Sequence, residues 1–123
     1  MLKEFSEQIV ADLNAASALI DLLDASGVSA LLSEEEDGDS FVNYAIRYNG
    51  NESKDGVAEY QVFIDSWSDT YTKSISIADQ VTAALAAALN QYKYVSAIPE
   101  PVFNEGTGKT NVVTKQIFNI YKY

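Results

Sequence analysis

The sequence VAEYQVFIDSWSDTYTKSISIADQVTAALAAALNQY, residues 57–92, carries the main signal for the fold, because its hydrophobic spacing changes midway. Residues 57–67 are rich in β-branched and aromatic side chains and predict a strand. Residues 68–70, Ser-Asp-Thr, then supply side-chain oxygens that favour the start of a helix. Over residues 71–92 the apolar side chains recur at helical spacing, in a stripe of Ile75, Ala78, Val81, Leu85, Leu89 and Tyr92 that Ile77, Ala84 and Ala88 widen. The stretch therefore predicts a strand followed by a helix that packs against a sheet or a neighbouring helix.

Upstream, residues 41–48 read FVNYAIRY and alternate between two faces of a strand. One face carries Val42, Tyr44, Ile46 and Tyr48. Residues 49–56, NGNESKDG, are turn-forming throughout, so the strands on either side predict an antiparallel hairpin. Residues 28–32 are short and apolar and indicate one more strand.

A helix is predicted over residues 3–24. Its apolar side chains recur at spacings of three and four, at Phe5, Ile9, Leu13, Ala16, Leu19, Ile20 and Leu23. Gly27 lies just past this stripe and favours the stop. Beyond it, residues 34–39 hold five like charges that repel one another and predict an exposed loop.

The C-terminal third predicts two further strands. Pro99 and Pro101 make residues 94–104 an irregular or edge strand, because proline lacks the backbone donor that a central strand needs. Residues 110–123 are rich in β-formers. Taken in order, the elements predict a single α+β domain, residues 1–123, with the order α-β-β-α-β-β. We expect a two-layer sandwich, a mainly antiparallel sheet with two helices packed on one face.

Composition excludes several kinds of chemistry. The 123 residues include no histidine and no cysteine, so catalytic or metal sites that need an imidazole or a thiol are absent. The net charge is −10 and is concentrated in residues 1–40, so we expect repulsion of nucleic-acid phosphates and no direct nucleic-acid binding. The longest apolar run, residues 83–89, is too short to span a bilayer, and the N-terminus lacks an apolar signal core. We expect a soluble protein with no membrane segment and no export signal.

Residues 104–110, NEGTGKT, are similar to the second half of a phosphate-binding loop. That motif requires a glycine at position 103, where Phe103 stands. It must also open a helix, whereas the following residues are strand-forming. The stretch is therefore interpreted as a flexible hairpin loop between the last two strands.

Carboxylates are abundant, but few have the spacing of a site. The strand residues Glu59 and Asp65 are the candidates for such a site, and a structural role is favoured for both. Asp37 and Asp39 lack the alternating acids and closing glutamate of a calcium loop. We expect no catalytic residue, no cofactor and no metal.

A family resemblance rests on residues 60–85 and 117–123. Asp65-x-Trp67 ends a strand, a turn with serine and Tyr71 follows, and a helix then carries Ala78-Asp79-x-Val81 and Ala84-Leu85. Together with a closing aromatic strand that ends in Tyr121-Lys122-Tyr123, this pattern resembles the phage tail-completion, or tail-terminator, family. One departure is the acidic run 34–39, where members often carry prolines.

The resemblance implies a structural protein rather than an enzyme. Such proteins assemble as a ring, typically of six copies, that stops growth of the tail tube and faces the head connector. The implied partners are other copies of the chain, the tail tube protein and the head connector protein. The implied location is the virion tail, with assembly in the bacterial cytoplasm.

Three segments are candidate contacts in such a ring. They are the acidic loop (Glu34, Glu35, Glu36, Asp37, Asp39), the hairpin loop (Glu105, Lys109) and the terminal strand (Tyr121, Tyr123), which we expect to be free to meet a partner. Three alternatives stay open: a head–tail neck protein of the same particle, a small hydrolase using Asp65 or Glu59, and a bacterial α+β interaction module unrelated to phage.

Overall fold

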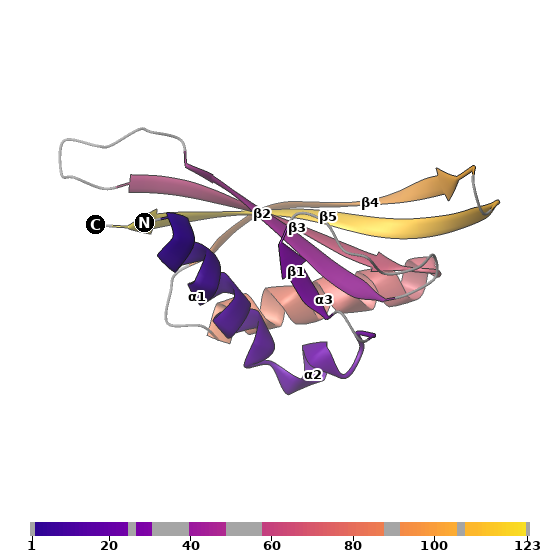
Figure 1. Cartoon of the computed structure of the whole chain (residues 1–123), viewed down its shortest axis with the longest axis horizontal. Coiled ribbons are helices and arrows are strands. Elements are labelled where there is room, and N and C mark those ends of the chain that lie inside the picture. Colours follow the sequence, from indigo (N-terminus) through magenta and orange to yellow (C-terminus); the bar gives the residue numbers. More distant parts are fainter. Residues whose placement is uncertain are drawn as a thin grey trace.

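The computed structural model describes residues 2–24, 27–30, 40–48, 58–87, 92–105 and 108–122. Its elements, in chain order, are α1 (Leu2–Asn14), α2 (Ser17–Ile20), β1 (Val28–Ala30), β2 (Phe41–Tyr48), β3 (Ala58–Ser68), α3 (Tyr71–Ala87), β4 (Lys93–Asn104) and β5 (Lys109–Lys122). The strands form one five-stranded sheet in the order β1-β2-β3-β5-β4 (Figure 1). Only β1 and β2 run parallel; the other pairs are antiparallel. The predicted α+β fold with a mainly antiparallel sheet is confirmed.

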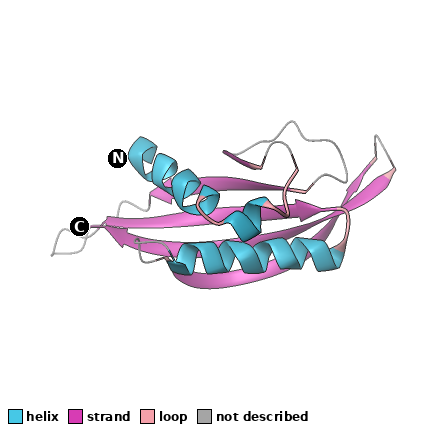
Figure 2. Cartoon of the chain, turned by 90° about the horizontal axis from the view of Figure 1, so that it is seen from below, coloured by secondary structure: helices cyan, strands magenta, loops and turns pink. Residues whose placement is uncertain are grey.

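All three helices lie on one face of the sheet, so the domain has two layers (Figure 2). The core between the layers is built from the apolar stripes of α1 and α3 and the inward-facing side chains of β2, β3 and β5. Its largest fully buried members are Phe118, Ile9, Leu13, Leu19, Ile64, Ile77, Leu85, Ile120, Val42, Val62 and Val81. The predicted packing of helices on one face is therefore confirmed.

The N-terminal helix is not continuous over residues 3–24, as the periodicity predicted. It breaks at Ala16, whose backbone is extended (φ −92°, ψ 95°), and the short α2 starts anew. The physical reason is the position of Leu19. In one straight helix Leu19 would be turned roughly 120° away from Leu13, since each residue adds 100°. The break lets both leucines be fully buried.

Gly27 does not stop the helix, because α2 already ends at Ile20. It has a positive φ of 57°, and its carbonyl accepts a hydrogen bond of 2.9 Å from the Val42 amide. Nearby, the Asp24 carboxylate accepts a hydrogen bond from the Ser40 amide, while the Asp24 amide donates to the Ser40 carbonyl at 2.7 Å. These bonds join the end of the helical segment to the start of β2.

The start of α3 is fixed much as the sequence indicated. Thr70 caps the helix, since its Oγ1 accepts a 3.2 Å hydrogen bond from the Lys73 amide. One turn on, the buried Ser74 hydroxyl bonds the Ser66 carbonyl and the Thr114 hydroxyl, both at 2.8 Å. The structure describes α3 over Tyr71–Ala87; residues 88–91 lie outside the described residues, so the predicted end of the helix near Tyr92 stays a prediction. Tyr92 precedes β4, and its hydroxyl donates to the Asp12 carboxylate at 2.8 Å.

The terminal strand lies inside the sheet, which corrects the expectation that it is free to meet a partner. β5 pairs with β3 from Val112 to Lys122 and with β4 from Lys109 to Asn119. Its inward side chains explain this position, because Phe118 and Ile120 are buried beneath the helices. β4, the strand that carries the prolines, lies at one edge of the sheet, as predicted, and β1 lies at the other.

Candidate interaction surface

The predicted contact residues are distributed unevenly over the structure. Glu34, Glu35, Glu36, Asp37, Asp39 and Tyr123 lie outside the described residues, so their predicted role stays a prediction. Tyr121 belongs to β5 and pairs with Glu59 of β3. Glu105 and Lys109 lie at the turn between β4 and β5, and both are exposed.

The β4–β5 hairpin continues beyond the rest of the sheet. β3 ends opposite Val112, so residues 109–111 of β5 pair only with residues 102–104 of β4. We call this two-stranded end, residues 102–105 and 108–111, the hairpin arm. In Figure 1 it projects past the N-terminal end of α3. Phe103 on the arm is 60% exposed, which is unusual for a phenylalanine.

The geometry of the arm explains the stretch NEGTGKT. Lys109 begins strand β5, not a helix, and pairs with Asn104 across the turn. Gly108 has a φ of 72°, a left-handed conformation that glycine adopts without steric cost. A phosphate site needs the amides at a helix N-terminus, so the prediction of a hairpin loop is confirmed.

The two mid-strand carboxylates do not form a paired-acid site. Glu59 and Asp65 lie on one strand six residues apart, or about 20 Å at the usual rise per residue. Glycosidase carboxylates lie within roughly 10 Å of each other. The structural role that the sequence favoured for these acids is therefore the better supported one.

Asp65 instead belongs to a charged cluster on the sheet face that the helices leave uncovered. It pairs in register with Lys115, whose Nζ lies 3.4 Å from a carboxylate oxygen of Glu100. Burial raises the pKa of Asp65; the Lys115 charge opposes this shift, and the Glu100 charge adds to it. Next to this cluster the rings of Phe41 and Trp67 stack, with centroids 5.8 Å apart. The arrangement is that of a packed, mixed surface rather than of a reactive site.

Exposed apolar side chains gather along the edge strand. Within the described part of the chain, the large hydrophobic residues that are exposed are Tyr48, Tyr71, Tyr94, Val95, Ile98 and Phe103. Four of these six belong to β4, and Tyr71 begins the helix beside it. Tyr71 and Tyr94 share the helix side, and exposed apolar side chains that lie together in this way on a small domain indicate a contact surface.

The backbone edge of β4 is poorly suited to pairing with another strand. Pro99 and Pro101 keep their register with Thr114 and Val112 of β5, so their missing N–H groups do not interrupt that ladder. The missing donors therefore face the open edge. A register shift between Tyr94 and Ser96 distorts the strand further. Both features are ways in which sheets resist edge-to-edge association.

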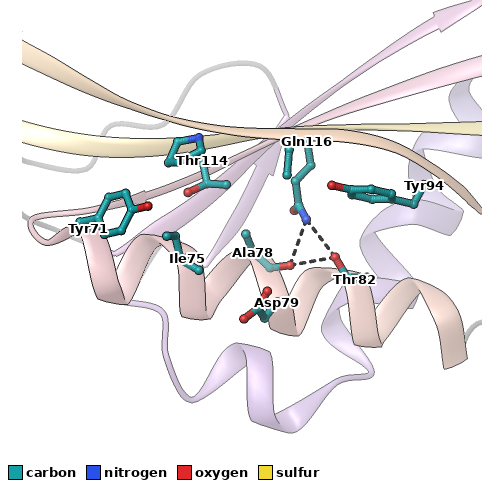
Figure 3. Close-up of a pocket in the computed structure, with 10 residues that line it drawn as sticks. Tyr71, Ile75, Ala78, Asp79, Thr82, Tyr94, Thr114 and Gln116 are labelled. Carbon is teal, nitrogen blue, oxygen red and sulfur yellow. Dashed lines mark hydrogen bonds between the residues drawn. The ribbon is translucent and has the colours of Figure 1, made fainter.

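A groove of about 440 Å³ lies between α3 and the inward face of β4 (Figure 3). It is lined by Tyr71, Ile75, Ala78, Asp79, Thr82, Tyr94, Ala97, Pro99, Thr114 and Gln116. The Gln116 side chain, 3% exposed, extends from the sheet toward α3. Its Nε2 donates to the Ala78 carbonyl at 3.1 Å and to the Thr82 hydroxyl at 2.9 Å. Its Oε1 is buried without a hydrogen-bond partner among the described residues.

Sequence reasoning missed this groove. Tyr94 was not a predicted contact residue, and Tyr71 was considered only as part of the motif that carries the family resemblance. The prolines were the available signal, because they identified β4 as the edge strand and hence the place where a helix stops covering the sheet.

The described residues offer neither a metal cluster nor a membrane helix. Among them, no group of three or more acidic side chains is placed to hold a metal ion. None of the described helices combines the length and apolar character needed to cross a membrane.

No protein-family model matches the sequence, and no curated protein sequence matches it. Solved structures do share the fold. One similar chain comes from a structure described as "Virion of native gene transfer agent (GTA) particle". It matches with a TM-score of 0.65 and 14% sequence identity, and the match covers 93% of this chain and 92% of that chain. At this level of identity the likeness shows a shared fold, over nearly the whole of both chains.

Proposed function

We propose that this chain is a non-enzymatic structural protein of a tailed phage, a prophage or a phage-like particle, in the position of a tail terminator. The observation that carries the proposal is the shared fold with a chain of a gene transfer agent virion, which covers 93% of this chain. The motif pattern of residues 60–85 supports the same assignment independently, because it resembles tail terminators.

In this role the chain forms a ring, with six copies, at the head-proximal end of the tail tube. It ends growth of the tube and presents a surface to the head connector, so its partners are its own copies, the tail tube protein and the connector protein. It resides in the virion tail and assembles in the bacterial cytoplasm. The acidic loop, the turn residues Glu105 and Lys109, and the C-terminal Tyr121 and Tyr123 are the proposed contacts.

The charge of the chain supports this role. A ring through which DNA passes has to let phosphates move, and a net charge of −10 disfavours a tight grip on them. The wide separation of Glu59 and Asp65 argues against the alternative of a small carboxylate hydrolase.

Electron microscopy of particles produced without this protein tests the proposal. We expect tubes of uncontrolled length that are not joined to heads, since nothing ends their growth. Complementation with the intact gene is the control and should restore joined tails of uniform length.

Two other outcomes would reassign the protein. Unjoined tails of normal, uniform length would place it in the head–tail neck instead. Particles with joined tails of normal length would remove both virion roles and leave the unrelated interaction module.

A further inference from the structure

In the isolated chain, the groove between α3 and β4 leaves a buried polar group without a hydrogen-bond partner among the described residues, and two aromatic side chains more than half exposed. Gln116 Oε1 is buried in its lining and accepts no hydrogen bond from the described residues. A buried acceptor without a donor costs about 1–3 kcal/mol. Around it, Tyr71 and Tyr94 expose 59% and 53% of their surface. The site therefore favours an occupant that brings both an apolar group and a hydrogen-bond donor.

The manner of binding follows from the edge of β4. Pro99 and Pro101 remove donors that an added strand would need, so the occupant does not extend the sheet. It has to insert side chains from the helix side, into the space that Figure 3 shows between α3 and the sheet.

The hairpin arm of another copy carries the matching groups. Phe103 and Thr110 are directly opposite in the β4–β5 register, so they share one face of the arm. Both are exposed, and together they offer a phenyl ring and a hydroxyl donor. The arm cannot fill the groove of its own chain. Phe103 lies four residues beyond Pro99 on the same strand, about 13 Å away.

Charge also favours contact between unlike parts of two copies. Residues 93–122 hold four lysines and two glutamates, a net charge of +2, whereas residues 1–92 hold sixteen acids and four bases, a net charge of −12. Asp79, on α3, lines the groove. Two chains of net charge −10 repel each other least when the β4–β5 segment of one, whose arm carries one acid and one base (Glu105 and Lys109), meets the acidic helical side of the other.

We propose that the hairpin arm of one copy docks in the α3–β4 groove of the next copy. Phe103 enters between Tyr71 and Tyr94, and a small shift of the Gln116 side chain brings its buried Oε1 within reach of the Thr110 hydroxyl, which donates to it. Because arm and groove are different patches, the contact is head to tail and repeats from copy to copy, which closes a ring when the rotation per copy allows. The inference rests on the proposed ring function and names the contact that builds the ring.

Disulfide trapping tests this contact, and the chain is well suited to it because it contains no cysteine. One preparation carries Phe103→Cys on the arm, and a second carries Ala97→Cys on the groove wall. Both positions are exposed, so neither change should affect folding. Mixed under mild oxidation, the two preparations should give a covalent dimer that joins one chain of each kind.

The matched control replaces Ala97→Cys by Ile98→Cys. Ile98 is 54% exposed and adjacent in sequence, but its side chain points to the other face of β4. We expect at least fivefold more mixed dimer with Ala97→Cys than with Ile98→Cys. A chain that carries both Phe103→Cys and Ala97→Cys should give a ladder of covalent multimers, as a head-to-tail contact requires.

Equal yields from the two groove-side positions would overturn the inference. So would preferential joining of the Phe103→Cys chain to itself, which indicates a symmetric contact between arms. The result is separate from the test of the proposed function. If rings form but this cross-link does not, the proposed function stands and the proposed contact is wrong. If the cross-linked ladder forms but the protein does not end tail tubes, the proposed contact stands and the proposed function is wrong.

Discussion

On the helix side of the sheet, neighbouring strands β5 and β4 present side chains in matched rows but bury them differently. Thr114, Gln116 and Phe118 of β5 are buried, whereas their cross-strand partners Pro99, Ala97 and Tyr94 of β4 are exposed. The rings of Tyr94 and Phe118 are only 5.9 Å apart, yet Phe118 is 2% exposed and Tyr94 53%.

The difference comes from the position of α3. This helix packs mainly on β3 and β5 and reaches β4 little. One strand spacing, about 4.8 Å, thus separates the core from a surface of similar chemical character. Composition along β4 and β5 therefore does not decide which strand stabilises the fold and which is left for contact; the reach of the covering helix does.

The largest expected difference between the two strands is in their phenylalanines. Phe118→Ala should lower the free energy of unfolding by about 3–5 kcal/mol, because it removes a buried ring and leaves a cavity. Phe103→Ala, on the exposed arm of β4, should change it by no more than about 0.5 kcal/mol. Urea unfolding of both variants at low protein concentration measures the contrast. Similar losses for the two would mean that the arm packs against the domain in solution.

A second test concerns the polar link between α3 and the covered strands. Ser74→Ala should cost about 1–3 kcal/mol, because it leaves the Ser66 carbonyl and the Thr114 hydroxyl without this partner in a buried place. Ser76→Ala is the matched control two residues along the same helix. Its hydroxyl bonds the Thr72 carbonyl at an exposed site, so its loss should stay within about 0.5 kcal/mol. If Ser74→Ala proved as mild as the control, α3 would be held by apolar packing alone.

The smallest effect is expected at Asp65, on the face without helices. Burial raises the pKa of its carboxyl in the folded chain, so the protonated form is favoured by folding. Its contribution to stability is therefore fully present below the unfolded pKa of about 3.9 and is lost as pH rises through the folded pKa. Asp65→Asn should stabilise the protein at pH 7 by about 0.5 kcal/mol and give no gain at pH 3, as followed by thermal unfolding across that range. A gain that persisted at pH 3 would point to a cause other than charge.

Much of the fold could be predicted from local patterns. The strand of residues 41–48 was placed at its observed bounds, and the capped start of α3 and the edge position of β4 were also correct. These three predictions succeeded because each feature is set by residues that are close together in the sequence. Alternating side chains define the strand, a threonine before a helix caps it, and prolines keep a strand out of the centre of a sheet.

The errors share a different cause. Breaking the first helix at Ala16 gains burial for Leu19, and no local signal in the run Asn14-Ala15-Ala16 requires it. The central place of β5 depends on β3, more than forty residues earlier in the chain. The groove could not be predicted either, because it depends on where α3 stops covering the sheet.

Which chemistry is open to this protein follows from its amino acids alone. The chain has no histidine, no cysteine and no glycine at position 103, and this excludes imidazole, thiol and phosphate-loop sites, because those functions need particular side chains. Which apolar side chains become core and which become surface depends instead on the folded arrangement. Hydrophobic side chains occur on both β4 and β5, and burial is a property of the space around a residue, which depends on where α3 crosses the sheet.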